Sequence, residues 1–428
     1  MSRLITALAL LALALPASAA TTAIVGGKVH TVGPQGTIEN GTVLIVDGRI
    51  AAVGADVDVP ADAVTIDASG KIVTPGLFSP FGQLGLVEVG FSAGPLDYSQ
   101  RGEQFTAGFD IADAYNPRST LIPINRIEGV TRAVVAPAPG YPDETGKGHI
   151  LAGLAAIVNL GDGDFLDQRA AAMVVVLGEG GASLSGGTRT GAWLTLRNSL
   201  NDALDYRENK GDFERGMRRA YTHSMADLDA LQGVVNGNTP LIVSIDRASD
   251  IEVLIDLVNE YGISAIIIGG SEAWMLASEL AAARIPVIVG PTANLPGDFD
   301  RINARLGTAS ILINAGVKVA IADSDAQTHN ARNMTQSAGN AVAFGLDWDA
   351  ALRAITLTPA EIFGMAATTG SLEIGKAADV VIWPGDPLEL TNYPDAVFIN
   401  GEAVPMESRQ TMLRDRYMQT EKPPAYRD

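Results

Sequence analysis

Short stretches in which apolar and polar residues alternate dominate the chain after its first twenty residues. Segments 23–32, 41–54 and 63–73 alternate with a period of two and contain Asp-Gly, Gly-Gly or Ser-Gly pairs, which predicts β-strands joined by tight turns. A second β-rich region covers 370–387 and 396–406. Because the two ends of a domain often meet in space, we expect residues 21–74 and 371–407 to form one small composite β-sandwich.

The middle of the chain has a different pattern, in which short and continuously apolar runs alternate with amphipathic stretches. These runs are typical of strands buried on both faces; they lie at 129–138, 171–178, 239–246, 264–270, 286–291 and 317–325. Helices are predicted between them, one over 250–262 with a capping box formed by Ser249 and Glu252 and one over 271–285. The alternation predicts an α/β domain over 75–370, with parallel strands in a barrel or an open sheet.

Two further segments stand apart from this alternation. Residues 194–232 form a long, charged stretch without strand pattern and are predicted to be a helical insertion in the α/β domain. Residues 408–428 are predicted to be a C-terminal tail, which ends near Pro423-Pro424.

The N-terminal segment 1–20 has the three parts of a cleaved secretory signal. Arg3 supplies the positive charge, Leu4 to Leu15 the apolar run, and Ala17-Ser18-Ala19 the small residues of a cleavage site. The run is too short for a membrane span, and the chain has no cysteine for a lipid anchor, a disulfide or a thiolate metal site. We therefore expect an exported, periplasmic protein without a membrane span in its mature chain.

The net charge of −19 narrows the choice of partners. An acidic chain repels the phosphates of nucleic acids and the headgroups of anionic membranes, so neither is expected as a partner. The chain also lacks the Gly-Lys-Ser/Thr of a phosphate loop, a dinucleotide fingerprint and a His-Glu-x-x-His zinc motif. The remaining expectation is a small-molecule substrate.

Several motifs together resemble those of the amidohydrolase superfamily, and within it the imidazolonepropionase-like exported members. The resemblance is carried by VDGRIAAVG and IDASGKIVTPGL near the start, by HNARN at 329–333, and by ALRAITLTPAEIFG and GSLEIGKAADVVIWPGDPLE near the end. It implies a (β/α)8 TIM-like barrel with a composite β-sandwich. It also implies hydrolysis of C–N bonds in small or cyclic amides, with one or two divalent metals at the carboxyl ends of the barrel strands.

The family's metal-binding histidines have no counterpart in this chain. By resemblance, a His-x-His pair follows the first barrel strand, and one histidine follows each of the fifth and sixth strands. The corresponding positions are Phe81, Gln83, Ser244 and Gly269. The chain has only four histidines, of which His30 lies in the sandwich, and the other three are His149, His223 and His329, so a four-histidine site cannot form. We therefore predict no bound cofactor, although a weakly held single zinc stays compatible with the carboxylates.

The remaining candidates for chemistry are residues at the ends of the predicted strands. The resemblance places the eighth-strand carboxylate at Asp323 or Asp325, with His329 four residues beyond the second. Asp246 ends the fifth strand, where it is either catalytic or one half of an ion pair with Arg247 at the barrel rim. The predicted catalytic residues are Asp323, Asp325, His329 and Asp246; the predicted substrate-binding residues are Phe81, Gln83, Ser244, Arg247, Asn330 and Arg332. Lys147, His149 and His223 are interpreted as loop or surface residues.

Two functions of different class remain open from the sequence. The first is a hydrolase of carbon–nitrogen bonds in which a carboxylate and a histidine activate water at a degenerate metal site. The second is an inactive paralogue that serves as a binding or assembly subunit, either as a homo-oligomer or paired with a metal-bearing amidohydrolase. Fold alone does not decide between them.

Overall fold

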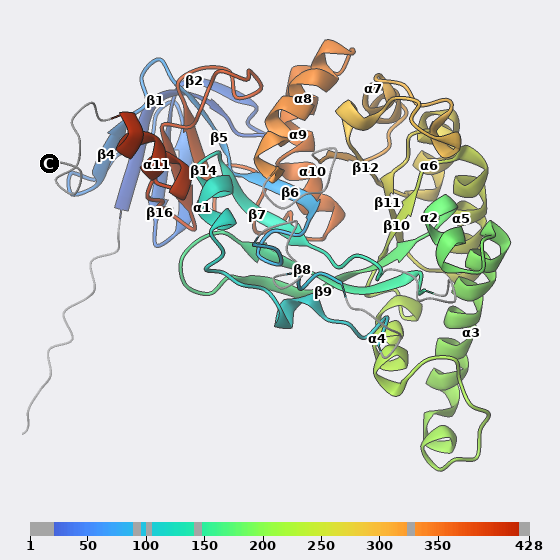
Figure 1. Cartoon of the computed structure of the whole chain (residues 1–428). Helices are drawn as coiled ribbons and strands as arrows, with labels where there is room; N and C mark the ends of the chain where they lie inside the picture. Colours follow the sequence, from blue (N-terminus) through green and yellow to red (C-terminus); the bar gives the residue numbers. More distant parts are fainter. Residues whose placement is uncertain (1–20, 89–95, 100–104, 141–147, 323–329, 419–428) are drawn as a thin grey trace, which may run out of the picture.

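A computed structural model describes residues 21–88, 96–99, 105–140, 148–322 and 330–418. The predicted signal segment, Lys147 and the candidates Asp323, Asp325 and His329 lie outside these residues. In the part described, no helix is both long and apolar enough to cross a bilayer. The described chain forms two eight-stranded sheets, with helices packed mainly around the second (Figure 1).

The first sheet combines strands from both ends of the chain, as predicted. Its neighbouring strands run in the order β16, β15, β14, β5, β1, β2, β3, with β4 also paired to β1. The joint between the two segments is the antiparallel pairing of β5 with β14, in which Val73 lies opposite Ile382. The strands are β1 Thr21–His30, β2 Thr37–Val46, β3 Arg49–Gly54, β4 Val64–Asp67, β5 Ile72–Pro75, β14 Val380–Trp383, β15 Ala396–Ile399 and β16 Glu402–Ala403.

The second sheet is a nearly closed barrel, whose strands follow one another in chain order from β6 to β13. They are β6 Leu77–Gly82, β7 Val130–Val135, β8 Leu151–Asn159, β9 Leu166–Val176, β10 Leu241–Ile245, β11 Ala265–Gly269, β12 Val287–Val289 and β13 Val319–Ile321. Counted along the sheet, β10 is the fifth strand, β11 the sixth and β13 the eighth, which agrees with the assignment by resemblance. The predicted fold class, an α/β barrel with a composite sheet, is confirmed; the predicted domain limits stay predictions.

One barrel strand departs from the prediction of parallel strands joined by helices. β8 pairs antiparallel with both β7 and β9, whereas all the other neighbouring pairs are parallel. Only six residues, 160–165, connect β8 to β9, and so short a connection allows a hairpin but no crossover. β8 was not predicted from the sequence, although it is a buried and mainly apolar run like the other barrel strands.

Helices cover the outside of the barrel, and α3 (Arg189–Glu214), the longest described helix, projects away from it (Figure 1). The predicted insertion is a helical pair, although Asn209 interrupts the regular backbone of α3. The α-helices are α1 Leu121–Arg126, α2 Gly178–Leu184, α3 Arg189–Glu214, α4 Met225–Val235, α5 Ala248–Tyr261, α6 Ala277–Ala283, α7 Thr308–Asn314, α8 Met334–Ala343, α9 Trp348–Ala354, α10 Leu357–Ile362 and α11 Arg409–Met418. The 3-10 helices are η1 Ile111–Asp113, η2 Ala273–Leu276, η3 Pro291–Ala293, η4 Phe299–Arg301 and η5 Ala331–Asn333.

The period of two along each barrel strand decides which residues face the inside. In β10, Leu241, Val243 and Ile245 belong to the core under the helices, whereas Ile242 belongs to a separate apolar cluster inside the barrel. Ser244, two residues after Ile242, therefore lies on the inner side near the carboxyl end of the strand. This register places Ser244, which the resemblance assigns to the fifth-strand histidine, at the barrel mouth.

Candidate functional site

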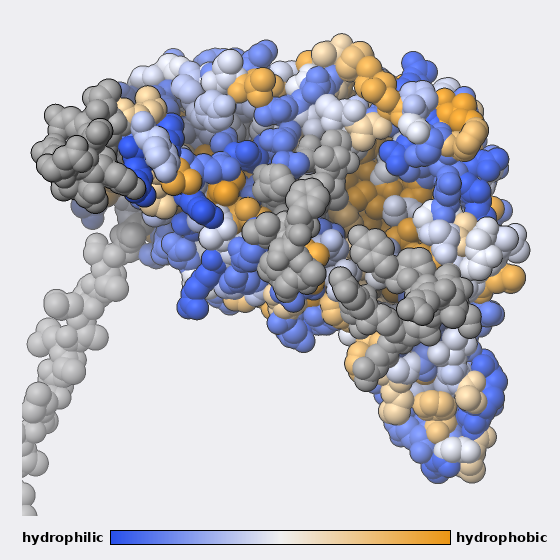
Figure 2. All heavy atoms as spheres, viewed as in Figure 1, coloured by the Kyte–Doolittle hydropathy of each residue, from blue (hydrophilic) through white to orange (hydrophobic). Residues whose placement is uncertain are grey.

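A cavity of about 360 Å³ lies at the carboxyl ends of the barrel strands. This end of a barrel carries the chemistry in enzymes of this architecture. The cavity is lined by apolar residues of several strands and by a smaller number of polar ones. Its polar lining residues are Gln83, Ser244, Asp246, Ser271, Asn294 and Arg301. On the face shown in Figure 2, apolar residues gather in a hollow near β11 and β12.

Four of the predicted site residues line this cavity together, namely Phe81, Gln83, Ser244 and Asp246. They come from segments far apart in the sequence, and the closure of the barrel brings them together. Their predicted roles in catalysis and binding stay predictions, since only their location is observed.

Three other predicted residues lie elsewhere. Arg247 is exposed and forms the N-cap of α5, so it does not line the cavity. The Arg332 backbone N–H donates to the Asn125 side chain, and its guanidinium donates to Gln410 at 3.3 Å, so this residue ties η5 to α1 and α11. Asn330 is the N-cap of η5 and also lies outside the cavity lining.

The interpretation of Asp246 and Arg247 as an ion pair is wrong. The guanidinium beside Asp246 belongs to Arg301, whose Nε lies 3.5 Å from Oδ2 of Asp246 and 3.1 Å from the carboxylate of Asp298. The other oxygen of Asp246 accepts hydrogen bonds from the backbone N–H of Ser271 at 3.0 Å and from its hydroxyl at 2.7 Å. These bonds fix the carboxylate between β10 and β11.

The predicted capping box of the following helix is also absent. α5 begins at Ala248, and its N-terminal backbone N–H donates to the carboxylate of Glu272 at 2.9 Å. The other oxygen of Glu272 accepts from the backbone and the side chain of Asn303 at 3.1 and 3.0 Å. Glu272 therefore holds three rim segments together, a role that the local pattern around Ser249 does not reveal.

The sixth-strand position, Gly269, shows why an imidazole is not accommodated here. Its φ is +95°, which side-chain-bearing residues rarely adopt, and a Cβ added there would lie 2.9 Å from Oδ1 of Asp246. The carboxylate of Asp246 thus occupies the space that a side chain at position 269 needs.

At the four positions that the resemblance assigns to metal ligands, the side chains present do not fit a divalent metal. Phenylalanine and glycine have no side-chain donor, and the neutral oxygens of Gln83 and Ser244 are poor replacements for imidazole. Within the described residues, no group of three or more His, Asp or Glu side chains is arranged to hold a metal ion.

The two described histidines of the barrel segment, His149 and His223, do not line the cavity. His223, interpreted as a surface residue, is half-buried, and its Nε2 lies 2.7 Å from the hydroxyl of Ser199. The Ser199 hydroxyl itself donates to the carbonyl oxygen of Thr195 at 2.8 Å, so it accepts from His223 rather than serving as a nucleophile. His149 is also half-buried, and its Nε2 has no hydrogen-bond partner in the described structure.

Burial lowers the pKa of His223, and also that of His30 in β1. The folded protein therefore binds these protons less readily than the unfolded chain, whose histidines titrate near pH 6.5. By linkage, the free energy of unfolding is highest above this pH and falls as the pH drops below it. We predict that His223→Asn weakens the loss of stability between pH 7.5 and pH 5.5, measured by urea unfolding at both values.

Asp227, the carboxylate that interacts most with His223, does not interfere with this measurement, because its lowered pKa confines its contribution to pH values below its ordinary 3.8. Burial raises the pKa of Glu128, but its contribution is the same in wild type and variant and cancels in the comparison. An unchanged difference between the two pH values in His223→Asn would show that His223 does not carry the effect. His30→Gln provides the parallel measurement at the other buried histidine.

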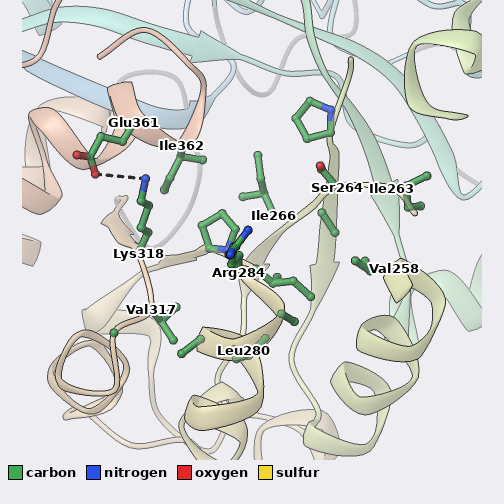
Figure 3. Close-up of a pocket in the computed structure, with 17 residues that line it drawn as sticks. Val258, Ile263, Ser264, Ile266, Leu280, Arg284, Val317, Lys318, Glu361 and Ile362 are labelled. Atoms are coloured by element: carbon green, nitrogen blue, oxygen red, sulfur yellow. Dashed lines mark ion pairs between the residues drawn. The ribbon is translucent and has the colours of Figure 1, made fainter. Parts of the chain in front are cut away.

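A second cavity, of about 490 Å³, lies at the opposite end of the barrel (Figure 3). It is lined by residues that precede β10 to β13 and by α10, and its walls are mainly apolar. Lys318 and Glu361 form an ion pair of 3.7 Å in its wall, and Glu361 is also bonded to Arg353 at 2.6 Å. None of the predicted site residues that the structure describes lies here, and residues at this end of a barrel usually serve stability.

Comparisons with known proteins agree with this architecture. Residues 205–404 match the model of the amidohydrolase family. The amidohydrolase tasK of Hapsidospora irregularis is 24% identical over 400 residues, a match that covers 86% of this chain and 39% of that protein. An imidazolonepropionase of Geobacillus sp. (strain WCH70) is 50% identical over 50 residues, or 10% of this chain and 12% of that protein. The chain thus spans about two fifths of the first relative and about an eighth of the second.

Among solved structures, an amidohydrolase from Thermotoga maritima MSB8 is similar in fold. It superimposes with a TM-score of 0.78 at 23% identity, and the match covers 90% of this chain and 99% of that one. The family match, the relatives and the barrel with its composite sheet point to the same group. Over residues 205–404 the chain matches the amidohydrolase family, and over most of its length it shares the fold of an amidohydrolase.

Proposed function

We propose that this protein hydrolyses a carbon–nitrogen bond of a small amide at the mouth of the barrel. The observation that carries the proposal is the cavity of about 360 Å³ at the carboxyl ends of the strands, which contains Gln83, Ser244 and Asp246. Its size suits a small molecule, and its mixture of apolar walls and few polar groups is typical of ligand sites.

The proposed site is degenerate with respect to the family's metal centre. No imidazole is supplied by Phe81, Gln83, Ser244 and Gly269. The proposed reaction therefore uses no metal ion. In its place, we propose that Asp323 or Asp325, which follow β13, accepts a proton from water, with His329 as its partner. The hydroxide adds to the amide carbonyl carbon, and the C–N bond breaks as the leaving nitrogen takes up the proton.

We predict that replacing one of the two aspartates, Asp323→Asn or Asp325→Asn, lowers turnover at least about 100-fold, since general acid–base catalysis typically contributes this much or more. Turnover is measured as amine release from a panel of neutral open-chain amides and lactams. Asp56→Asn, at an exposed position of the composite sheet domain, is the matched control and should leave turnover unchanged. Full activity in both aspartate variants would contradict the proposed chemistry.

The second candidate function is a non-catalytic binding or assembly subunit, and the absence of imidazole at all four ligand positions favours it. This alternative predicts no turnover across the panel, and co-purification from the native host with either a second copy or a metal-bearing amidohydrolase. A monomer that hydrolyses amides by itself would exclude it. Metal analysis of the purified protein with and without added zinc tests the predicted absence of a bound ion.

We further propose that residues 1–20 direct export to the periplasm. Fractionation of cells that express the full chain should then recover a shortened protein from the periplasm. Replacement of Ala17 and Ala19 by bulky residues should block the shortening.

A further inference from the structure

Asn294 lies in the wall of the cavity of about 360 Å³ at the barrel mouth, hereafter the mouth cavity. Its side-chain amide is a hydrogen-bond donor that has no partner among the described residues. Asn294 follows η3 and is only 3% exposed, yet its Nδ2 has no hydrogen-bond partner in the described structure. Buried polar groups are nearly always paired, and an unpaired one calls for an explanation such as a missing ligand. Asn294 lines the cavity, but its Nδ2 is closed to solvent in this orientation, so the side-chain amide has to turn toward the cavity to donate to a ligand.

The carboxylate of Asp246, in the same cavity, has an oxygen that can accept a further hydrogen bond. Oδ1 of Asp246 receives both hydrogen bonds from Ser271, while Oδ2 lies 3.5 Å from Nε of Arg301 without a hydrogen bond between them. A carboxylate oxygen can accept two hydrogen bonds. Oδ2 of Asp246 therefore remains able to accept an N–H from a ligand.

The charges around these two groups disfavour an anionic ligand. Among the described residues, Arg301 is the one cation that lines the cavity, and it lies between the carboxylates of Asp246 and Asp298. The described part of this rim therefore carries more negative than positive charge. Apolar side chains such as Phe81, Ile268 and Ile288 form much of the remaining wall. A carboxylate ligand would have to lose water next to two like charges, whereas an uncharged ligand would not.

We propose that the cavity selects an uncharged secondary amide on an apolar body. Asn294 donates a hydrogen bond to the carbonyl oxygen of the ligand, and Asp246 accepts one from its N–H. Asp246 is thereby assigned to ligand binding and not to proton abstraction. This assignment rests on the proposed function for the use of the mouth cavity as the substrate site, but it concerns binding alone.

Binding of three probes by isothermal titration calorimetry at pH 7.5 tests the assignment. N-benzylacetamide carries both the N–H and the carbonyl, N-benzyl-N-methylacetamide lacks the N–H, and 3-phenylpropanoate is a carboxylate of similar size. We expect N-benzylacetamide to bind at least tenfold more tightly than either of the others. Equal binding of the three, tighter binding of the carboxylate, or no binding of any probe would overturn the assignment.

Two variants test whether Asp246 and Asn294 cause the preference for N-benzylacetamide. Asp246→Asn keeps an oxygen for Ser271 and replaces the acceptor Oδ2 by a donor, so N-benzylacetamide should lose its advantage over its N-methyl analogue. Asn294→Leu should weaken both amides at least tenfold. The matched controls are Asp298→Asn, which also faces Arg301 but does not line the cavity, and exposed Asn314→Leu; neither should change the pattern.

Folding of each variant is checked by circular dichroism and thermal unfolding. If Asn294→Leu fails to fold, Asp246→Asn still tests the assignment. The ratio of the dissociation constants of the two amide probes, measured on one protein, does not depend on the fraction of that protein that is active. Retention of the wild-type ratio in folded Asp246→Asn would overturn the assignment. The expected binding pattern without any turnover would support the binding assignment and contradict the proposed hydrolase function. Turnover restricted to carboxylate-bearing amides would support the hydrolase function and contradict the binding assignment.

Discussion

Replacement of Arg132 by methionine should lower the free energy of unfolding by about 3–5 kcal/mol, the range for breaking a buried ion pair on one side. Arg132 lies in β7, is 5% exposed, and its guanidinium contacts the carboxylates of Asp167, at 2.7 Å, and Asp379. It also donates to the side chain of Asn400 at 2.9 Å. Methionine fills similar volume but leaves two carboxylates without their cation at the contact between the barrel and the composite sheet.

Arg169→Met is the matched control, measured by the same urea unfolding experiment. Arg169 also contacts two carboxylates, those of Asp110 and Asp113 at 2.6 and 2.8 Å, but its side chain is 47% exposed. Exposed ion pairs contribute about 0–1 kcal/mol, so this variant should remain close to wild type. Similar losses in both variants would show that burial does not govern the contribution of Arg132.

Replacement of Gly269 by alanine should lower the free energy of unfolding by about 2–4 kcal/mol, because a strained backbone and a displaced buried group act together. At φ +95° an L-residue is strained, and the new Cβ would lie 2.9 Å from the Asp246 carboxylate. The carboxylate then has to move away from Ser271, with loss of its two hydrogen bonds. Urea unfolding gives the stability, and the probes described above report the displacement of Asp246.

Gly262→Ala separates the two contributions. Gly262 ends α5 with φ +63°, and no atom lies within 4 Å of the point that an added Cβ would occupy, so only the backbone cost of about 1–2 kcal/mol remains. An equal loss at both positions would show that the contact with Asp246 is not important. Gly269→His should likewise be destabilised and should not gain zinc binding, since the imidazole enters a place already occupied.

Much of the fold follows from local pattern. Period-two alternation predicted the strands at both ends of the chain, and the apolar runs predicted β7, β9, β10, β11, β12 and β13. β8 was not predicted, and the general prediction of parallel strands is wrong for it. The direction of a strand depends on the length of its connections rather than on its own residues. The capping of α5 by Glu272 escaped for a related reason, since the acceptor comes from the next strand's end.

For the candidate site, the sequence by itself determined what is missing. The count of four histidines follows from residue identity alone. The assignment of Phe81, Gln83, Ser244 and Gly269 to the ligand positions follows from the resemblance and stays a prediction. Only the tertiary structure decided that Arg301 rather than Arg247 faces Asp246, that Arg332 lies away from the mouth, and that Asn294 ends in its wall without a partner. The physical reason is that these contacts join loops after different strands, and the closure of the barrel, not any local pattern, sets which loops meet.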